Sequence, residues 1–231
     1  MHQIEEIFKT ERLFREGRSL AYSWLCEFDY PWEALAKIPH FILELGAGLP
    51  KDLYHLIGEN VWVAASARIS PSAEIKGPCV IGEGTEVRQG AFLRGGTLVG
   101  NGAVVGNSTE LKNCILFDCV QVPHYNYVGD SILGYRAHMG AGAITSNVKG
   151  DRTLVTVKWG SCAIETQLSK LGAMLGDYAE IGCNSVLNPG TVIGRHSNVY
   201  PLSSVRGYIP ENCIYKGNGT IAVKSADASH Q

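Results

Sequence analysis

Two basic residues, Arg94 and Lys112, are spaced 18 residues apart, and each directly follows a leucine. If the chain repeats at this spacing, the two side chains stand one above the other, with their Cα atoms about 5 Å apart. Two like charges at this separation repel by roughly 1 kcal/mol in water. A phosphate group held between them would replace the repulsion by charge-assisted hydrogen bonds. The spacing therefore predicts a phosphate clamp formed by Arg94 and Lys112.

The stretch VPHYNYVGD, residues 122–130, is a second candidate for chemistry. Its histidine, His124, is a candidate general base, because the imidazole group ordinarily titrates close to neutral pH. Glu110 could orient this imidazole. Tyr127 falls where the surrounding repeat has aliphatic residues, so its phenol should lean out of the core towards a polar partner or a ligand. We expect a distorted, exposed edge here, because the repeat fails around residues 112–126.

The elements that position these residues follow a six-residue repeat, which predicts their architecture. An aliphatic residue recurs at every sixth position, and a small residue usually follows it four positions later. Each hexad supplies one short strand and one corner, so three hexads close a coil of triangular section with the aliphatic side chains inside. This pattern predicts a mainly β protein, a parallel β-helix. The aliphatic positions form two long tracts and a shorter third: Val63, Ile69, Ile75, Ile81, Val87, Leu93, Val99, Val105 and Leu111; Leu175, Ile181, Leu187, Ile193, Val199 and Val205; Tyr127, Leu133 and Met139.

The segments outside the repeat suggest three further units. Residues 1–58 have apolar residues at helical spacing and form a helical N-terminal cap on the solenoid or, alternatively, a partner-binding arm. Helix starts are expected near Pro31 and Pro39 and a stop at Gly46 or Gly48. The β-helix is expected over residues 59–210, with a loop or β-excursion at residues 146–167. Residues 211–231 form a C-terminal extension that ends in a disordered SADASHQ.

Composition excludes several classes of partner. Twenty basic against 22 acidic residues give a net charge of −2, which offers no field for nucleic acid or an anionic membrane. No apolar run approaches the roughly 18 residues of a membrane span. The charged N-terminus does not resemble a signal peptide. The seven cysteines, without a CxxC pair, are expected to be free buried thiols in the reducing cytoplasm.

The segment VPHYNYVGDSILGYRAHMGAGAITSNV, residues 122–148, resembles the acetyltransferase domain of the bifunctional N-acetylglucosamine-1-phosphate uridylyltransferase/glucosamine-1-phosphate acetyltransferase family. The family pattern is H-x-x-Y-x-G-D, followed by I-G-x-x-x-N-x-G-A-G-T-x-T-x-N. KLGAMLGDYAEIGCNSVLNPG, residues 170–190, is also similar, and the resemblance covers about residues 60–210. It implies a left-handed β-helix, usually a homotrimer, with acetyl-CoA sites between subunits.

Carried over by position, the resemblance assigns roles to individual residues. It implies that Arg94 and Lys112 bind the phosphate and that His124 takes a proton from the sugar amine. At the remaining positions it implies contacts with the substrate for Tyr127, His138 and Asn147, and with the coenzyme for Ala141 and Gly142. His138 stands where the family has a sugar-binding Asn. The family's sugar-binding lysine has no clear counterpart, and its candidates are Lys149, Arg152 and Lys158.

Together these observations predict an acetyl-CoA-dependent N-acetyltransferase that acts on an amino-sugar 1-phosphate. No L-A-A-G-x-G-T-R loop is present, so no nucleotidyltransferase activity is expected from this chain. One alternative is a non-catalytic sugar-phosphate-binding or assembly module, which would ignore acetyl-CoA. A second is a γ-class carbonic anhydrase, which would need three histidines at coil-compatible spacing around a zinc ion between subunits, with His124, His138 and His196 as the candidates. No metal is expected on the leading prediction.

Overall fold

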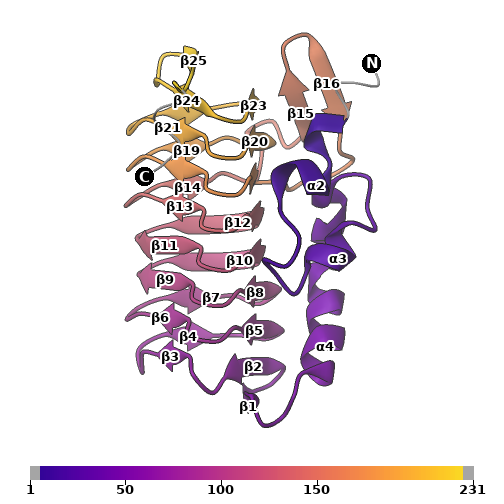
Figure 1. The fold of residues 1–231 in the computed structure, drawn as a ribbon, viewed down its shortest axis with the longest axis vertical. Helices are drawn as coiled ribbons and strands as arrows, with labels where there is room; N and C mark the ends of the chain where they lie inside the picture. Colours follow the sequence, from indigo (N-terminus) through magenta and orange to yellow (C-terminus); the bar gives the residue numbers. More distant parts are fainter. Residues whose placement is uncertain (1–5, 226–231) are drawn as a thin grey trace.

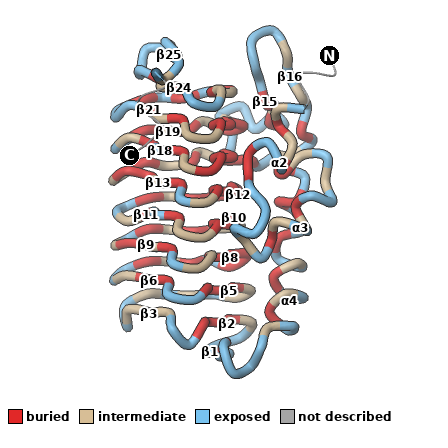
Figure 2. The backbone as a smooth tube through the Cα atoms, viewed as in Figure 1, coloured by how far each residue is buried: buried red, intermediate tan, exposed pale blue. Residues whose placement is uncertain are grey.

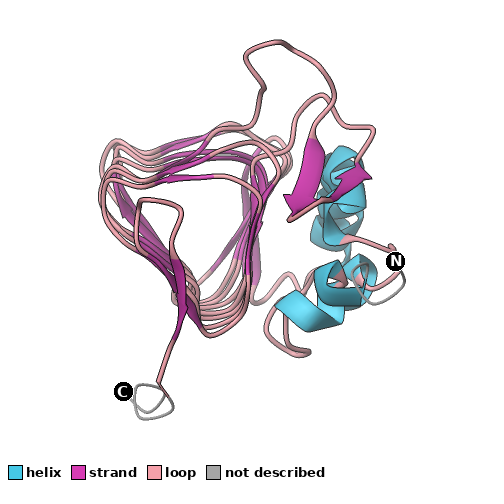
Figure 3. Ribbon diagram, turned by 90° about the horizontal axis from the view of Figure 1, so that it is seen from above, coloured by secondary structure: helices cyan, strands magenta, loops and turns pink. Residues whose placement is uncertain are grey.

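The protein is a left-handed parallel β-helix with helices packed along one side, and the computed structural model describes residues 6–225 (Figure 1). Seen along its axis, the β-helix has three flat faces (Figure 3). Ala226–Gln231, which make up most of the expected disordered tail, lie outside the described residues, as does Ile4. The hexapeptide pattern therefore predicted the fold.

The strands are grouped here by face, in the order in which the chain visits the faces. Face 1 contains β4 (Glu74–Ile75), β7 (Phe92–Leu93), the starts of β10 (Glu110–Leu116) and β12 (Tyr127–Leu133), β14 (Ile144–Thr145), β19 (Val186–Leu187) and β22 (Ser204–Val205). Face 2 contains β2 (Val61–Ala64), β5 (Cys79–Ile81), β8 (Thr97–Val99), the ends of β10 and β12, β17 (Ala173–Leu175), β20 (Thr191–Ile193) and β23 (Tyr208–Ile209). Face 3 contains β3 (Arg68–Ile69), β6 (Glu86–Val87), β9 (Val104–Asn107), β11 (Gln121–His124), β13 (His138–Met139), β18 (Glu180–Ile181), β21 (Asn198–Val199) and β24 (Cys213–Tyr215).

The aliphatic positions of the two long tracts fill the axis of the β-helix, as predicted. All of them are buried except Ile69 and Ile75, which lie near its N-terminal end and stay partly exposed. In the third tract, Leu133 and Met139 are fully buried. Tyr127 is not in the axis, because its neighbour Val128 takes the inward position.

The reason is that the repeat shortens by one residue at one corner. Leu111 pairs with Leu93 of the preceding coil at the full length of the repeat. It pairs with Val128 of the following coil, which comes one residue sooner than that length predicts. The shortening falls at the corner between face 1 and face 2, where Asn113 and Asp130 have left-handed backbones with φ of +48° and +46°. Asn and Asp tolerate this conformation better than most residues.

The repeat does fail within residues 112–126, at the Asn113 corner, but the expected distortion around His124 is absent. Val122 pairs with Val105 and His124 with Asn107, so β11 continues the coil in register. His124 is exposed, as predicted, because it lies at the corner between face 3 and face 1. The shortened corners lie before and after this stretch, at Asn113 and Asp130, and both belong to the boundary between face 1 and face 2.

The N-terminal segment packs on the β-helix, as predicted, but it covers a side face and not an end. Helix α4 lies against β5, β8 and β10, and η2 lies against β12 (Figures 1 and 3). Nearer the C-terminal end of the β-helix, the Asp177 N–H donates to the Leu13 carbonyl at 3.0 Å. The segment therefore runs along face 2. Its elements are η1 (Glu6–Phe8), α2 (Thr10–Leu13), α3 (Tyr22–Leu25), η2 (Pro31–Lys37) and α4 (Ile38–Gly48).

The segments packed on face 2 explain why its strands are buried on both sides. All three residues of β5, β8, β17 and β20 are buried, whereas the two-residue strands of faces 1 and 3 mostly pair one buried with one more exposed residue (Figure 2). Strands covered on both sides are apolar throughout, as in other parallel sheets. The outward positions of face 2 are accordingly Val80, Leu98, Ile115, Ile132, Met174 and Val192, all buried.

The helix limits agree with the sequence prediction, since η2 begins at Pro31, α4 has Pro39 in its first turn and Gly48 is its last residue. Gly46 has a packing role, because a Cβ at this position would overlap the ring of Trp62. Replacing Gly46 by alanine should therefore lower the free energy of unfolding by roughly 1–3 kcal/mol. Thermal unfolding measures this. Gly48→Ala is the matched control, because nothing lies within 4 Å of a Cβ there, and an equal effect of both changes would contradict the packing role.

The excursion after Thr145 folds back onto face 2 as a two-stranded antiparallel hairpin, β15 (Thr156–Trp159) and β16 (Cys162–Glu165). Val155, just before β15, and Val157, within it, are buried, and Trp159 packs edge-on against Tyr208 with ring centroids 5.5 Å apart. The hairpin therefore extends the cover of face 2 beside the N-terminal segment.

Two expectations need correction. The boundaries at residues 58 and 210 shift, because β1 (Tyr54–Gly58) already pairs with β2, and β24 continues the coil stack before the antiparallel β25 (Ile221–Val223). The cysteines are free, but Cys26 and Cys183 are exposed and not buried.

Within residues 6–225, no helix is long and apolar enough to cross a bilayer.

Candidate functional site

Arg94 and Lys112 occupy the same outward position on adjoining coils of face 1, as their spacing predicts. The Arg94 N–H donates to the Leu111 carbonyl at 2.8 Å, which fixes this alignment. Their charges are balanced by carboxylates: Arg94 Nη1 lies 2.8 Å from Glu110 Oε1, and Lys112 Nζ lies 3.4 Å from Asp130 Oδ2. Each cation keeps further N–H donors for a ligand, since guanidinium has five and ammonium three.

Asp130 lies at the corner between face 1 and face 2 and bonds to the polar side chains around it. It is only 5% exposed. Besides Lys112, its carboxylate accepts hydrogen bonds from Asn113 Nδ2 at 2.9 Å and from Asn147 Nδ2. These residues, together with Tyr127, are called the Asp130 cluster below. Buried carboxylates need such partners, because an unpaired buried charge is strongly unfavourable.

Tyr127 joins this cluster from the start of β12. Its hydroxyl accepts a hydrogen bond from Asn147 Nδ2 at 3.3 Å, so the phenol has found the polar partner that the sequence predicted. Burial, and secondarily the negative charge of Asp130, raise the pKa of the Tyr127 hydroxyl. The phenol is therefore neutral at physiological pH and keeps its proton to donate to a ligand.

The Tyr127 ring lies over Gly129, and this contact gives a testable prediction. A Cβ on residue 129 would come within 2.6 Å of the Tyr127 hydroxyl oxygen. Gly129→Ala should displace the ring and cost roughly 1–3 kcal/mol of stability. In a Tyr127→Ala background the same change should cost much less. Thermal unfolding of the four proteins in this double-mutant cycle measures the coupling, and additive effects would contradict it.

His124, Ala141 and Gly142 form a second group at the opposite edge of face 1. The Gly142 N–H donates to the His124 carbonyl at 3.0 Å, so the two corners stack directly. Gly142 has φ of +71°, and a Cβ there would overlap the Asn184 side-chain oxygen, so a larger residue would have to displace this side chain.

Glu110 is not bonded to His124 in the part of the chain that the structure describes, and His138 lies on a different face from Tyr127 and Asn147. Glu110 pairs with Arg94. Its carboxylate therefore balances the charge of Arg94 and does not orient the imidazole. The His124 backbone N–H donates to Asn126 Oδ1 at 3.1 Å. His138 lies on face 3, between Gln121 and Glu180 of the adjoining coils.

Asp130 and Asn113 were missed as candidate residues, although the sequence carries a signal for them. Asp130 lies 17 residues from Asn113 and 17 residues from Asn147, and this spacing is the length of the shortened coil. Polar residues that are separated along the sequence by the length of one coil are expected to stack on one another. The signal was missed because every coil was assumed to keep the full length of three hexads.

The three histidines of the carbonic anhydrase alternative are separated. His196 lies at the corner between faces 2 and 3, where its ring stacks on Tyr178 with centroids 4.6 Å apart. Among the described residues, no group of three or more His, Cys, Asp or Glu side chains could hold a metal ion.

Comparison with known proteins gives one family and several relatives. Residues 75–208 match the family described as GMPPB C-terminal domain. The bifunctional protein GlmU of Methanococcus maripaludis is 31% identical over 202 residues, 86% of this chain and 49% of that protein. A bifunctional sugar-1-phosphate nucleotidylyltransferase/acetyltransferase of Sulfurisphaera tokodaii is 33% identical over 94 residues, 41% of this chain and 23% of that protein. The chain thus spans half or less of the length of these two relatives.

Among solved structures, a mutant of perosamine N-acetyltransferase from Caulobacter crescentus, in complex with CoA and GDP-perosamine, is similar to this chain. The identity is 18% and the TM-score 0.38, over 70% of this chain and 56% of that one.

Proposed function

Because the chain belongs to the GMPPB C-terminal domain family, we propose that it is an acetyl-CoA-dependent N-acetyltransferase acting on an amino-sugar 1-phosphate. The observation that carries the proposal is the joining of Lys112 and Asn147 through the buried Asp130 carboxylate, with Tyr127 bonded to Asn147. Arg94 lies beside them on the adjoining coil. A stacked pair of cations next to neutral hydrogen-bonding groups suits a phosphorylated sugar. The Sulfurisphaera tokodaii relative is named as a bifunctional sugar-1-phosphate nucleotidylyltransferase/acetyltransferase, which is in keeping with this substrate class.

The proposed reaction is a direct acyl transfer. The sugar amine attacks the carbonyl carbon of the acetyl thioester, a C–N bond forms, the C–S bond breaks and coenzyme A leaves as the thiolate. His124 takes the proton that the amine loses and returns it to the thiolate. Arg94 and Lys112 hold the phosphate, while Tyr127, Asn147 and His138 contact the sugar or the acetyl group. Ala141 and Gly142 form the wall against which the coenzyme lies.

We propose further that the working form is a homotrimer in the cytoplasm, with each site completed by a neighbouring subunit. This arrangement would bring the His124 edge of one subunit to the Asp130 cluster of the next. The exposed His124 corner supports it: Tyr125 and Leu202 lie on this corner with left-handed backbones, φ +52° and +59°, and side chains 64% and 79% exposed. Large apolar side chains left in solvent at one corner are typical of a surface that a neighbouring subunit covers.

Release of free thiol from acetyl-CoA, measured against a panel of amino-sugar phosphates, tests the proposed function. Glucosamine 1-phosphate should give release well above the background hydrolysis. Unphosphorylated glucosamine should give far less, because it lacks the group that Arg94 and Lys112 bind. Release that is the same with and without any amino sugar would contradict the proposal.

A further inference from the structure

Arg206 differs from the other cations that share its outward position on face 1. Lys76, Arg94 and Lys112 each pair with a carboxylate, at 3.1, 2.8 and 3.4 Å. Arg206 donates to Asn188 Oδ1 at 3.0 Å, and within residues 6–225 no carboxylate pairs with it. Its charge is therefore available to an anion from solution.

Asn188 holds Arg206 in a defined position. The Asn188 amide nitrogen donates to the Val205 carbonyl at 2.8 Å and to the Ser204 hydroxyl at 3.0 Å. These bonds orient its amide oxygen towards Arg206. The guanidinium keeps four N–H donors after this bond, in the fork geometry that matches a phosphate group.

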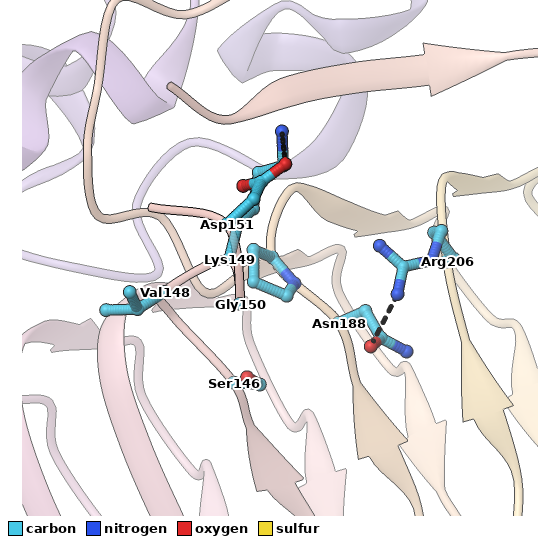
Figure 4. Close-up of a pocket in the computed structure, with 8 residues that line it drawn as sticks. Ser146, Val148, Lys149, Gly150, Asp151, Asn188 and Arg206 are labelled. Atoms are coloured by element: carbon cyan, nitrogen blue, oxygen red, sulfur yellow. Dashed lines mark hydrogen bonds and ion pairs between the residues drawn. The ribbon is translucent and has the colours of Figure 1, made fainter. Parts of the chain in front are cut away.

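Arg206 lines a pocket of about 340 Å³ at the root of the excursion. Ser146, Asn188 and Arg206 come from successive coils of face 1, because Thr145 pairs with Leu187 and Leu187 with Val205. Across from them, residues 148–151 form the other wall, and Figure 4 shows Arg206 bonded to Asn188 on one side and Lys149 and Asp151 on the other.

The charges around this pocket favour an anion. Arg206 and Lys149 are positive, and Asp151 is the one carboxylate among the residues that line the pocket. Asp151 accepts bonds from the Thr153 N–H at 3.0 Å and the Thr153 hydroxyl at 2.9 Å, and lies 3.6 Å from Lys149 Nζ. Lys149 Nζ also donates to the Thr153 hydroxyl and to the Leu154 carbonyl, so Arg206 carries the charge that is left for an anion. The lining thus carries one net positive charge and the Ser146 hydroxyl as a further donor.

We propose that this pocket, lined by Ser146, Lys149, Asn188 and Arg206, binds the phosphate group of a ligand at a site separate from the phosphate clamp. Arg206 stands four coils beyond Lys112 in the same column, about 19 Å along the axis at strand spacing. One phosphate cannot reach both places. The proposal goes beyond the proposed function, since it concerns binding alone and holds whether or not acetyl transfer occurs.

Calorimetric titration with inorganic pyrophosphate tests the site. It is carried out in an Arg94→Gln background, which weakens the clamp at the cost of one exposed ion pair. Arg206→Gln should weaken binding roughly tenfold, the contribution of a charge-assisted hydrogen-bonded pair. Asp151→Asn, which keeps the acceptor for Thr153 but removes the opposing charge, should tighten binding by about threefold. Lys76→Gln, outside the pocket in the same column, is the control and should leave the affinity unchanged.

Arg206→Gln and Lys76→Gln remove the same charge from the same column, so a loss of affinity in the first alone distinguishes a built site from general surface charge. Equal affinity of the Arg206→Gln variant and its parent would overturn the proposal, and so would failure of the parent to bind pyrophosphate. Competition then identifies the source of the phosphate. Displacement of pyrophosphate by coenzyme A, but not by glucosamine 1-phosphate, supports the site and assigns it to the coenzyme; the reverse supports it and assigns it to a sugar phosphate.

Discussion

Replacing His124 by alanine is expected to lower turnover at least 100-fold, because general-base catalysis contributes about 10²–10⁴-fold to such reactions. The ammonium form of a sugar amine cannot attack a thioester, and the attacking amine must lose a proton as the amide forms. The dissociation constants of acetyl-CoA and the sugar phosphate should change little, since His124 is not assigned to binding either of them. Steady-state turnover and calorimetric binding measure the two effects.

The matched control is His40→Ala. His40 is an exposed histidine on α4 that lies 3.3 Å from Glu44, on the segment that covers face 2. This variant should keep wild-type turnover. Wild-type turnover in the His124→Ala variant would exclude the histidine as the base. A parallel loss of binding and turnover would indicate a structural role at the corner instead.

Replacing both members of the clamp, Arg94→Gln with Lys112→Gln, is expected to lower kcat/KM for an amino-sugar 1-phosphate by at least 100-fold. Each charge-assisted hydrogen bond to a phosphate contributes about 1.5–3 kcal/mol, and both are removed. The loss should be specific to the phosphate: unphosphorylated glucosamine should react with both proteins equally slowly.

Stability must be measured beside activity for this variant. The Arg94–Glu110 pair is largely exposed, so its loss costs little. Asp130 is buried and keeps only its bonds from Asn113 and Asn147 once Lys112 is gone, so Tm should fall. Lys76→Gln controls for the loss of a cation from the same column. A double variant that discriminates between phosphorylated and unphosphorylated sugar as wild type does would contradict the clamp.

The solenoid could be predicted from the sequence because its determinants are local. An aliphatic residue at every sixth position, such as Leu93, Val99 and Val105, specifies a coil whatever the rest of the chain does. The stacking of Arg94 on Lys112 followed from the same arithmetic.

The cover of face 2 could not be inferred in the same way, because it depends on contacts between distant segments. Gly46 meets Trp62, Asn113 donates to the Leu35 carbonyl, and Phe14 packs on Phe117 with ring centroids 4.8 Å apart. The apolar triplets of face 2 carried an unused signal, since an uncovered face would alternate polar with apolar residues.

The Asp130 cluster was missed for a related reason. One residue lost at a corner changes the register of the strands that follow, so hexad counting placed Tyr127 at the aliphatic position that Val128 holds, although its phenol was expected to lean out of the core. Hexad counting gives the position of a corner but not its conformation. The left-handed backbones of Asn113 and Asp130 decide which side chains meet there.

The most direct test of the central claim is to identify the product by mass spectrometry after incubation of the protein with acetyl-CoA and glucosamine 1-phosphate. We expect a product heavier than the sugar phosphate by one acetyl group, formed in step with free coenzyme A and absent with the His124→Ala variant. Acetyl-CoA that stays intact and does not bind, in a protein that still binds the sugar phosphate, would contradict the account and would identify the chain as a non-catalytic sugar-phosphate-binding module.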